Sequence, residues 1–351
     1  MYSTRDHSQN LGRPTRNDVA REAKISGATV SRVLSGRNDF PISAETRAKV
    51  IEAVERLGYR PNPNARALMT RKSGLVGFWM CLQYSRYRCQ VLDRMRMLLG
   101  QTELAMAVTD IDEEYHWDRC FTRSLRVPVE GIIAFDASDS IEALGQSYDR
   151  LAPSTPFVSM GSYWSSAKSY VGTDLKSGAQ DAMDHLLQTG RKRISYLAPW
   201  NSGLIDKGVR YEAYVERMQA AGLTCDTISA QGVTSALVGE ALSERMACGP
   251  GPDAILCMND DLALASSVAL TRAGVKVGSD IALVGFDGIA ETEDCPCPIT
   301  TVKQPINEMC DLALRFLRAQ MEDPRAPLQQ QVLKPTLVIR TSSTGYSPNN
   351  S

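Results

Sequence analysis

One run of small and hydrogen-bonding side chains could contact a nucleic acid. In a short helix expected after Ser26, apolar residues recur at helical spacing and form one buried stripe. The edges of that stripe and the opposite face carry small or polar side chains around one arginine, which suits close approach to base edges in a major groove. A purely structural helix pair would show the same stripe, so core periodicity alone is not functional. The contacting residues would be Gly27, Ala28, Thr29, Ser31 and Arg32.

The charge distribution supports the nucleic-acid interpretation. The 351-residue chain has 39 Lys and Arg against 40 Asp and Glu, so its total charge is near zero. Residues 1–72 hold 14 of the basic and 7 of the acidic residues, whereas the remainder holds 25 and 33. A basic N-terminal fifth joined to an acidic body indicates a nucleic-acid module attached to a domain with another task. On charge alone, an ordinary solvated basic surface is an equal alternative.

Composition excludes several classes of protein. An apolar content of 43% and a charged content of 23% are ordinary for a globular protein and exclude disorder or a collagen-like repeat. The longest nearly uninterrupted apolar run, residues 75–82, is too short to span a bilayer. Residues 1–10 lack the apolar centre of a signal peptide, which predicts a cytoplasmic location. Nine cysteines without framework spacing are expected to be reduced thiols.

Three helices are expected in the first 60 residues. Thr15 and Asp18 have the spacing of a capping box, which would begin a helix. Ser26 can cap a second helix after a short break, and two short helices joined by a tight turn are typical of a helix-turn-helix motif. A third helix is expected from Ser43 to Gly58. It would bury Ala48, Val50, Ile51, Val54 and Leu57.

A fourth, shorter helix is expected to depend on a partner. Asn62 can act as its N-cap, and Pro63 would occupy the first helical position. The helix could run only about two turns, and isolated helices of this length are marginal in water. Arg66, Arg71 and Lys72 surround Leu68 in this segment, so DNA is the expected partner.

These motifs together resemble the DNA-binding headpiece of the LacI/GalR family of bacterial transcription regulators. The resemblance runs without a gap over about residues 13–73. It is carried by Asp18-Val19-Ala20, by the segment 25–34, by Ser43-Ala44-Glu45-Thr46-Arg47 and by the segment 57–62. The resemblance implies that Arg32 reads a guanine and that Leu68 wedges into the minor groove at the operator centre. The expected DNA contacts are Thr15, Arg16, Ser26, Gly27, Ala28, Thr29, Ser31, Arg32, Asn64, Arg66 and Leu68.

Two features of the headpiece depart from the family pattern. Gly27 and Ala28 stand at the base-contacting start of the recognition helix but offer little hydrogen bonding. Sequence choice there would rest on contact with thymine methyl groups and on fit. The connection over residues 37–41 is slightly long, which could shift phosphate contacts.

The remaining chain predicts parallel sheets covered by helices. Buried strands are expected at residues 75–80, 104–108, 131–135, 157–160, 193–197, 254–258 and 281–285, and helices at 175–189, 208–221 and 261–273. Strands that alternate with helices are typical of doubly wound α/β folds. The family resemblance continues here. It implies two subdomains similar to those of periplasmic sugar-binding proteins, linked by crossing strands, with a ligand cleft between them.

Within this body the resemblance implies an effector site built around Arg210, Asn259 and Asp287. These residues stand in the motifs Arg210-Tyr211-Glu212-Ala213-Tyr214, Asn259-Asp260 and Gly285-Phe286-Asp287. Asp287 follows a predicted strand, and ligands of open α/β sheets bind beyond the carboxyl ends of strands. An arginine and an aspartate can share several hydroxyl groups of one polyol, which favours a sugar as the effector. For Asp260, helix capping is an equal alternative.

The first subdomain departs from the family in its loops. Where the family has an Asn-Pro-Phe-like loop, this chain has Trp79-Met80-Cys81-Leu82-Gln83-Tyr84, and Gly161-Ser162-Tyr163-Trp164 follows another strand. Trp79, Tyr84 and Gly161 are therefore the expected effector contacts in this half. Core packing is the commoner fate of a tryptophan such as Trp79. The effector's identity stays open.

Three other functions are alternatives to a ligand-controlled regulator. An enzyme on the same fold would need a nucleophile and a base, and the three histidines pair with no cysteine or carboxylate at metal spacing. Cys295, Cys297 and Cys310 do not have zinc-site spacing. Neither a metal nor a cofactor is expected. Control by a protein co-effector and an architectural DNA binder without a ligand are further alternatives.

The expected organisation has five parts and one self-partner. Residues 1–12 form a flexible arm, 13–61 the helix-turn-helix domain, 62–73 the hinge, 74–341 the effector-binding and dimerisation domain, and 342–351 a flexible tail. A headpiece that reads one half-site needs two-fold symmetry to read a palindromic operator, so a homodimer is expected.

Overall fold

The computed structural model describes residues 14–35, 41–60, 72–81, 85–111, 127–136, 155–161, 168–200 and 208–345. The chain divides into two compact units, residues 1–73 and 74–351. No helix within the described ranges is both long and apolar enough to cross a membrane. The hinge residues Asn64, Arg66 and Leu68 lie outside these ranges.

In its described residues, the first unit consists of α1 (Arg16–Glu22), α2 (Gly27–Ser35) and α3 (Ala44–Leu57), which form the headpiece. Thr15 caps α1 in a capping box with Asp18, as expected from the sequence. The Ser26 hydroxyl accepts the backbone N–H of Thr29 at 3.1 Å and so satisfies a free donor at the start of α2. The core is formed by Val19, Ala23, Val30, Val33, Val50 and Ala53.

The buried face of α3 differs from the expected one. Ala48 and Ile51 are exposed, and Ala53 takes a core position instead. Val50, Ala53 and the half-buried Val54 are spaced by three and four residues, whereas Ile51 lies one residue, about 100°, around the helix from Val50. The helix begins and ends as predicted, with Ser43 as its N-cap and Gly58 in the left-handed region at φ 61°.

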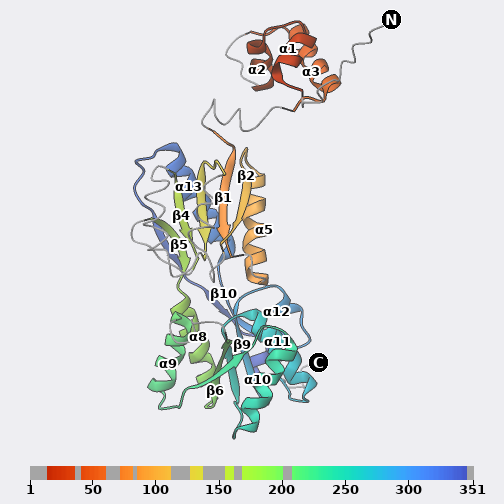
Figure 1. The fold of residues 1–351 in the computed structure, drawn as a ribbon. Helices are drawn as coiled ribbons and strands as arrows, with labels where there is room; N and C mark the ends of the chain where they lie inside the picture. Colours follow the sequence, from red (N-terminus) through yellow and green to blue (C-terminus); the bar gives the residue numbers. More distant parts are fainter. Residues whose placement is uncertain are drawn as a thin grey trace, which may run out of the picture. The chain divides into compact units, whose positions relative to one another are not determined.

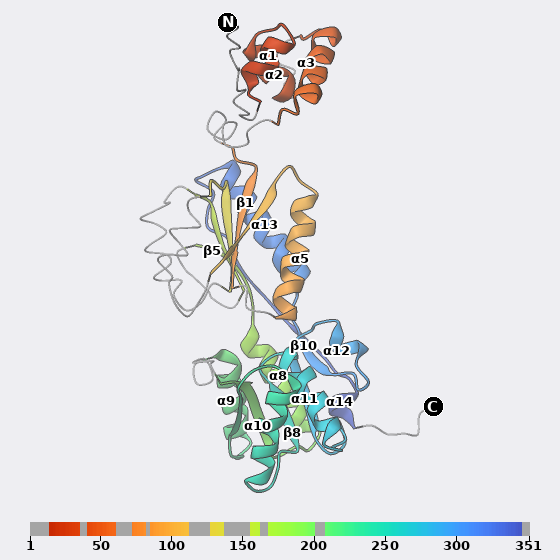
Figure 2. The ribbon, with the colours of Figure 1, turned by 45° about the vertical axis from the view of Figure 1, so that its right-hand side comes forward.

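Sheet A defines the first half of the second unit, called subdomain A. Its strand order is β11-β5-β4-β3-β1-β2, and every pair is parallel. One face packs against helices α5 (Arg86–Gly100) and α13 (Ile306–Glu322), as Figure 2 shows. The strands are β1 (Leu75–Met80), β2 (Ala105–Asp110), β3 (Gly131–Phe135), β4 (Phe157–Met160), β5 (Ser169–Thr173) and β11 (Gln330–Leu333).

Sheet B defines the second half, subdomain B, and is covered on both faces. Its strand order is β12-β10-β9-β8-β6-β7, and only the pairing of β12 with β10 is antiparallel. Helices α8 (Leu175–Gln188) and α9 (Val209–Ala220) pack on one face, and α10 (Ser235–Ala247) and α11 (Asp260–Arg272) pack on the other. The strands are β6 (Ile194–Pro199), β7 (Asp226–Ala230), β8 (Ala254–Cys257), β9 (Ala282–Asp287), β10 (Thr300–Lys303) and β12 (Thr336–Val338).

The chain passes between the two subdomains repeatedly (Figure 1). It leaves sheet A after β5 and enters α8, returns from β10 to α13, and crosses again from β11 to β12. Each subdomain is therefore assembled from separate segments of sequence. The predicted fold class is confirmed: an all-helical headpiece is followed by two doubly wound parallel-sheet subdomains.

The C-terminal boundary of the body differs from the expected one. Residues 341–344 form a short helix, α14 (Thr341–Thr344), in which Ser342 and Ser343 are buried. The Ser342 hydroxyl accepts the backbone N–H of Thr300 at 2.8 Å, and it donates to the Leu283 carbonyl at 2.5 Å. The flexible tail expected from residue 342 is thus wrong for these residues, because their hydroxyl groups are bonded to β9 and β10.

Candidate DNA-contact surface and effector site

The expected DNA-contact residues between Thr15 and Arg32 lie on α1 and α2 or directly before these helices. Ala28 and Arg32 are one helical turn apart on α2, and both are exposed. From α1, the Arg16 guanidinium donates to the Ser31 hydroxyl at 3.2 Å. A Cβ added to Gly27 would lie 3.5 Å from Arg16 Nε, an ordinary van der Waals contact, so Arg16 lies directly beside the start of α2. The arrangement presents two arginines beside small residues.

The hydroxyl groups at the starts of these helices are occupied within the headpiece. The Thr15 hydroxyl donates to the Asp18 carboxylate at 2.7 Å, and these contacts with Thr15 lower the pKa of Asp18. The hydroxyl groups of Ser26 and Thr29 are 2.8 Å apart. These side chains therefore hold the first turns of α1 and α2 in place, beside the surface that Arg16 and Arg32 present.

Arg210 and Asp287 lie close together in subdomain B. Arg210 stands in the first turn of α9, and its Nη1 donates to the Met258 carbonyl at 2.7 Å. The same nitrogen is 3.9 Å from Asp287 Oδ1, and the guanidinium lies over the Phe286 ring, 5.0 Å from its centroid. Its side chain keeps 23% of its surface exposed. The structure thus brings together, from distant parts of the sequence, two of the three effector residues predicted in this subdomain.

Asp287 has an unusual environment at the carboxyl end of β9. Its backbone has φ 119°, a conformation that side-chain-bearing residues rarely adopt. The Gln304 amide donates to its Oδ1 at 2.9 Å. Burial raises the pKa of Asp287 well above its usual range, although Arg210 acts in the opposite direction. A buried, strained carboxylate beside an incompletely buried arginine is the kind of group that binding sites contain.

Asn259 is the cap of α11, and Asp260 is not. The Asn259 side chain accepts the backbone N–H of Leu262 at 3.0 Å. Asp260 instead points into the protein, with none of its surface exposed. The capping alternative for Asp260 is therefore wrong, because its neighbour already fills that role. Because the side-chain oxygen of Asn259 forms the cap, its NH₂ group is the part that would contact a ligand.

Subdomain A changes the expected set of effector residues. Trp79 is 1% exposed, and its ring packs edge-on against Phe157 with centroids 6.2 Å apart. It lies on the sheet face opposite Phe78, because successive strand side chains alternate between faces. Its indole is used by the core, which corrects its assignment as an effector contact. Tyr84 lies outside the described residues.

Gly161 and Asp136 mark the strand ends of subdomain A. Gly161 follows β4 with φ 107°, and its carbonyl accepts the Tyr170 hydroxyl at 2.8 Å. A Cβ there would fall 2.2 Å from Asp136 Oδ1, so only glycine leaves room for that carboxylate. Asp136 follows β3 and has φ 43°. The charges of Asp136 and Asp287 both add to the effect of burial, which raises the pKa of Tyr87.

The sequence did not assign Asp136, Tyr87 or Gln304 to the site, although Gln304 belongs to the family-like motif of residues 300–305. Asp136 directly follows a strand that was predicted correctly, so the strand-end rule applied to Asp287 could have found it. Tyr87 stands in α5, which was not predicted, and Gln304 lies just after β10. Their placement depends on how distant segments pack, and no local signal marks it.

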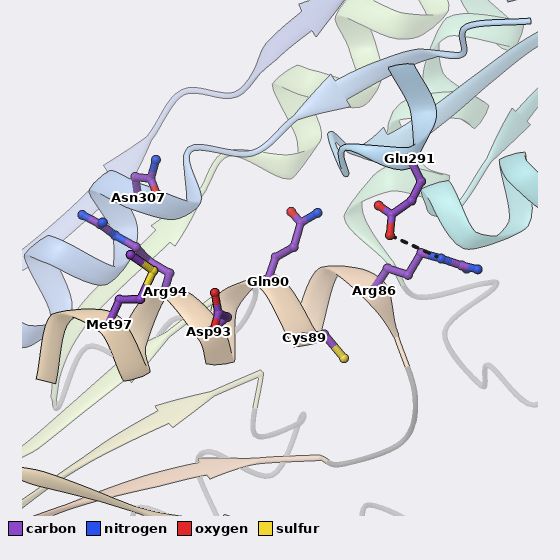
Figure 3. Close-up of a pocket in the computed structure, with 8 residues that line it drawn as sticks. All are labelled: Arg86, Cys89, Gln90, Asp93, Arg94, Met97, Glu291 and Asn307. Atoms are coloured by element: carbon purple, nitrogen blue, oxygen red, sulfur yellow. Dashed lines mark ion pairs between the residues drawn. The ribbon is translucent and has the colours of Figure 1, made fainter. Parts of the chain in front are cut away.

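A hollow of about 510 Å³ lies beside α5, and neither Arg210 nor Asp287 lines it. Figure 3 shows Arg86, Gln90 and Arg94 along α5, with Glu291 of α12 (Glu291–Asp294) opposite Arg86. Arg86 Nε is 3.7 Å from Glu291 Oε1. Its Nη1 lies 2.5 Å from Asp261 of α11. Arg86 thereby connects subdomain A to two helices of subdomain B.

The cysteines show neither a metal nor a redox arrangement in the described part of the chain. No group of histidine, cysteine and carboxylate residues there could hold a metal ion. Cys310 is buried in subdomain A, where burial raises its pKa to about 12. Cys295 and Cys297 lie in subdomain B, and their thiols donate to backbone carbonyls. Cys310 therefore lies in a different subdomain from Cys295 and Cys297.

Comparison with known proteins agrees with these two units. Residues 15–62 match the model of bacterial regulatory proteins of the lacI family, and residues 183–343 match the periplasmic binding protein-like domain. Catabolite control protein A from Staphylococcus aureus is 28% identical over 314 residues, which are 88% of this chain and 92% of that protein. A ribose operon repressor from Halalkalibacterium halodurans is 27% identical, covering 94% and 97% of the two chains.

Solved structures show the same fold. The Lac repressor dimer bound to operator and an anti-inducer superposes with a TM-score of 0.79 and 24% identity, covering 95% of this chain and 99% of that chain. The transcriptional regulator CelR in complex with cellobiose gives a TM-score of 0.65 at 25% identity, covering 94% and 100%. These relatives are transcription regulators and not enzymes. The chain belongs to the LacI family and is a DNA-binding transcription regulator.

Proposed function

We propose that the chain is a repressor that binds a palindromic operator as a homodimer and responds to a sugar or related polyol. The observation that carries the effector part is the Arg210–Asp287 pair at the carboxyl end of β9, with Asn259 at the start of α11. Carboxylate, guanidinium and amide groups together can bond several neighbouring hydroxyl groups. The relatives named for ribose and solved with cellobiose support this class of ligand.

The DNA-binding part of the proposal rests on the headpiece. Arg32 on α2 would read a guanine, and Arg16 with Gly27 and Ala28 would approach the bases beside it. This surface would be held against the sugar–phosphate backbone of the DNA by the hydroxyl-bearing residues Thr15, Ser26, Thr29 and Ser31. From the sequence, Asn64, Arg66 and Leu68 would form the hinge segment, with Leu68 in the minor groove. A protein that acts on chromosomal DNA in this way would work in the cytoplasm.

Control of DNA binding would follow from the two-subdomain body. A ligand that contacts both subdomains favours one of their relative orientations, and it shifts the equilibrium only by its differential affinity for the two states. In a dimer, that orientation would set the spacing of the two hinge segments. Such coupling is commonly worth about 1–3 kcal/mol.

The proposal is tested in two steps with the full-length protein. First, a thermal-shift screen with D-ribose, D-glucose, cellobiose and their phosphate esters identifies a ligand. Second, DNA binding to a selected operator is measured by fluorescence anisotropy with and without it. Arg210→Ala and Asp287→Ala should abolish the response to the ligand, yet leave ligand-free DNA affinity within a few-fold of wild type.

Arg217→Ala is the matched control for these two variants. Arg217 lies on the same helix as Arg210 and pairs with Asp184, with Nε 2.8 Å from Oδ1. It should keep the full response. A response that survives in both Arg210→Ala and Asp287→Ala would show that the effector binds elsewhere.

A further inference from the structure

Asp260 is a buried carboxylate whose partners come from two other segments of the chain. Its Oδ2 accepts the backbone N–H of Gly288 at 2.7 Å and that of Ile289 at 2.9 Å. Its Oδ1 accepts the hydroxyl of Thr301 at 2.7 Å. None of the Asp260 surface is exposed. The first turn of α11 is thereby bonded to the loop after β9 and to strand β10.

Both of these segments adjoin the candidate effector site. Gly288 directly follows Asp287, and φ is 119° at Asp287 and 79° at Gly288. Thr301 belongs to β10, after which the chain crosses to subdomain A. At that crossing, Gln304 bonds the Asp287 carboxylate. The side chain of Asp287 therefore contacts the crossing segment, and Asp260 bonds both the backbone beside Asp287 and the strand that leads to the crossing.

The neighbouring sequence leaves room for an aspartate at this position. A Cβ added to Gly285 of β9 would fall 2.1 Å from Asp260 Oδ1 and 3.1 Å from the Ala263 Cβ. Strand β9 thus has a glycine at the position where the Asp260 carboxylate packs against it. A longer glutamate would meet the same strand, so the three hydrogen bonds require a short acidic side chain.

We propose that Asp260 is a positioning residue for effector binding: it fixes the strained Asp287 turn and the crossing strand β10 relative to each other. A change in structure caused by ligand binding at Asp287 would then be transmitted to the segment that joins the two subdomains. This inference rests on the proposed effector site, and it adds a residue that does not touch the ligand.

The strength of the hydrogen bonds from both segments to Asp260 depends on the charge of its side chain. Burial raises the pKa of Asp260 to about 7, although the three donors act against this rise. The charged groups around it are Asp287 at the end of β9, Asp261 on its own helix, Arg210 beside Asp287 and the exposed Lys303 next to Gly288. Protonation places a hydrogen on one carboxyl oxygen and removes an acceptor. The hold should therefore weaken as the pH falls.

Hydrogen exchange of the Gly288 and Ile289 amides in the full-length protein tests this directly. Protection is compared at pH 6 and pH 8 after correction for the intrinsic exchange rate. At pH 8, Asp260→Asn should speed exchange of both amides at least about tenfold, since a hydrogen bond to a charged acceptor is lost. In wild type, protection should fall at pH 6, and in Asp260→Asn it should not depend on pH. Glu244→Gln, which changes an exposed carboxylate on α10 of the same subdomain, should leave both amides unchanged.

Thr301→Val gives a second, milder test that does not depend on the fold of Asp260→Asn. It removes the hydroxyl that donates to Asp260 while keeping the volume of the side chain. The same hydroxyl also accepts the backbone N–H of Gly288 at 3.2 Å, so protection in this variant is read at the Ile289 amide. Without that hydroxyl the carboxylate loses stabilisation, so the loss of amide protection should occur at a higher pH than in wild type. An unchanged pH profile in Thr301→Val, or unchanged amides in Asp260→Asn at pH 8, would overturn the inference.

Calorimetry with D-ribose, D-glucose and cellobiose separates this inference from the proposed function. If one of these sugars binds wild type, Asp260→Asn should weaken that binding at least about tenfold at pH 8. Sugar binding with unaltered affinity in Asp260→Asn would leave the effector site standing and remove Asp260 from it. If no sugar binds but the amides respond as expected, the positioning role stands and the ligand class is wrong.

Discussion

The Arg86 guanidinium and the Asp261 carboxylate meet at 2.5 Å and join α5 of subdomain A to α11 of subdomain B. The backbone N–H of Arg86 also donates to the same carboxylate, at 3.3 Å. Asp261 keeps only 6% of its side-chain surface exposed, whereas Arg86 keeps 37%. A carboxylate buried on one subdomain is thus neutralised by an arginine from the other.

Arg86→Ala should destabilise the body because it leaves the Asp261 charge buried without this cation. Breaking a fully buried pair costs about 3–5 kcal/mol, and the partial exposure of Arg86 reduces this to about 1–3 kcal/mol. Urea unfolding of the full-length protein measures it. Arg96→Ala, which removes an exposed pair with Asp93 on the same helix, should change stability by less than about 0.5 kcal/mol. An equal loss in the free energy of unfolding in both variants would show that the pair with Asp261 stabilises the body no more than the exposed pair does.

Arg32→Ala should weaken specific DNA binding by about 1–3 kcal/mol and relax selectivity at one base pair in each half-site. Affinity for selected and scrambled operators at fixed salt gives both quantities. Arg56→Ala is the control, because Arg56 is engaged with Glu22 between α3 and α1. If Arg32→Ala weakens binding to both DNA sequences equally, then Arg32 contacts phosphates and does not read a base.

Gly178→Ala should destabilise subdomain B by about 1–3 kcal/mol through overpacking. Its added methyl group would lie 2.6 Å from Val302 Cγ1 and 2.7 Å from Pro335 Cγ, where α8 packs on the crossing segments. Gly239→Ala is the matched change in α10, where the nearest atom would be 3.4 Å away. There the helix preference of alanine should add up to about 1 kcal/mol. Thermal melts that move in the same direction for both variants would contradict the packing argument.

His185 should make the body less stable in mild acid. Its Nε2 lies 2.7 Å from the Ser343 hydroxyl of α14, and burial lowers its pKa. The unfolded chain then binds the proton more readily than the folded one. The stabilisation is present above the unfolded pKa of about 6.5 and is lost as the pH falls through the lowered folded value. His185→Gln should reduce the drop in melting temperature between pH 7.5 and pH 5.5; an identical drop would exclude His185 as its cause.

The sequence was most informative where structure is local. The capping residues Thr15, Ser26 and Ser43 begin their helices as expected, and Gly58 ends the third. The strands expected at 75–80, 131–135 and 157–160 have the observed bounds, because a buried parallel strand is a continuous apolar run. A charged residue placed after such a run, as Asp287 is, could therefore be predicted at a sheet edge.

What the sequence could not supply depends on contacts between distant segments. Trp79 has the same alternation pattern whether its face of the sheet is covered or borders a cleft, and only packing against Phe157 decides this. Ile51 is as apolar as Val50, yet Val50 lies on the buried face of the helix and Ile51, one residue further on, is exposed. Asp260 and Asn259 are adjacent polar residues at a helix start, and their different roles depend on Gly288 and Thr301.

The pairing of β5 with β11 has a consequence for synthesis of the chain on the ribosome. β5 ends at Thr173, but its sheet neighbour β11 begins only at Gln330, and α13 covers the same sheet from Ile306. At translation rates of about 5–20 residues per second, sheet A remains incomplete for on the order of ten seconds, until these segments have been synthesised. During that interval one edge of β5 and the apolar face under α13 are uncovered. The nascent chain should therefore need chaperone protection longest in its first subdomain, although that subdomain is started first.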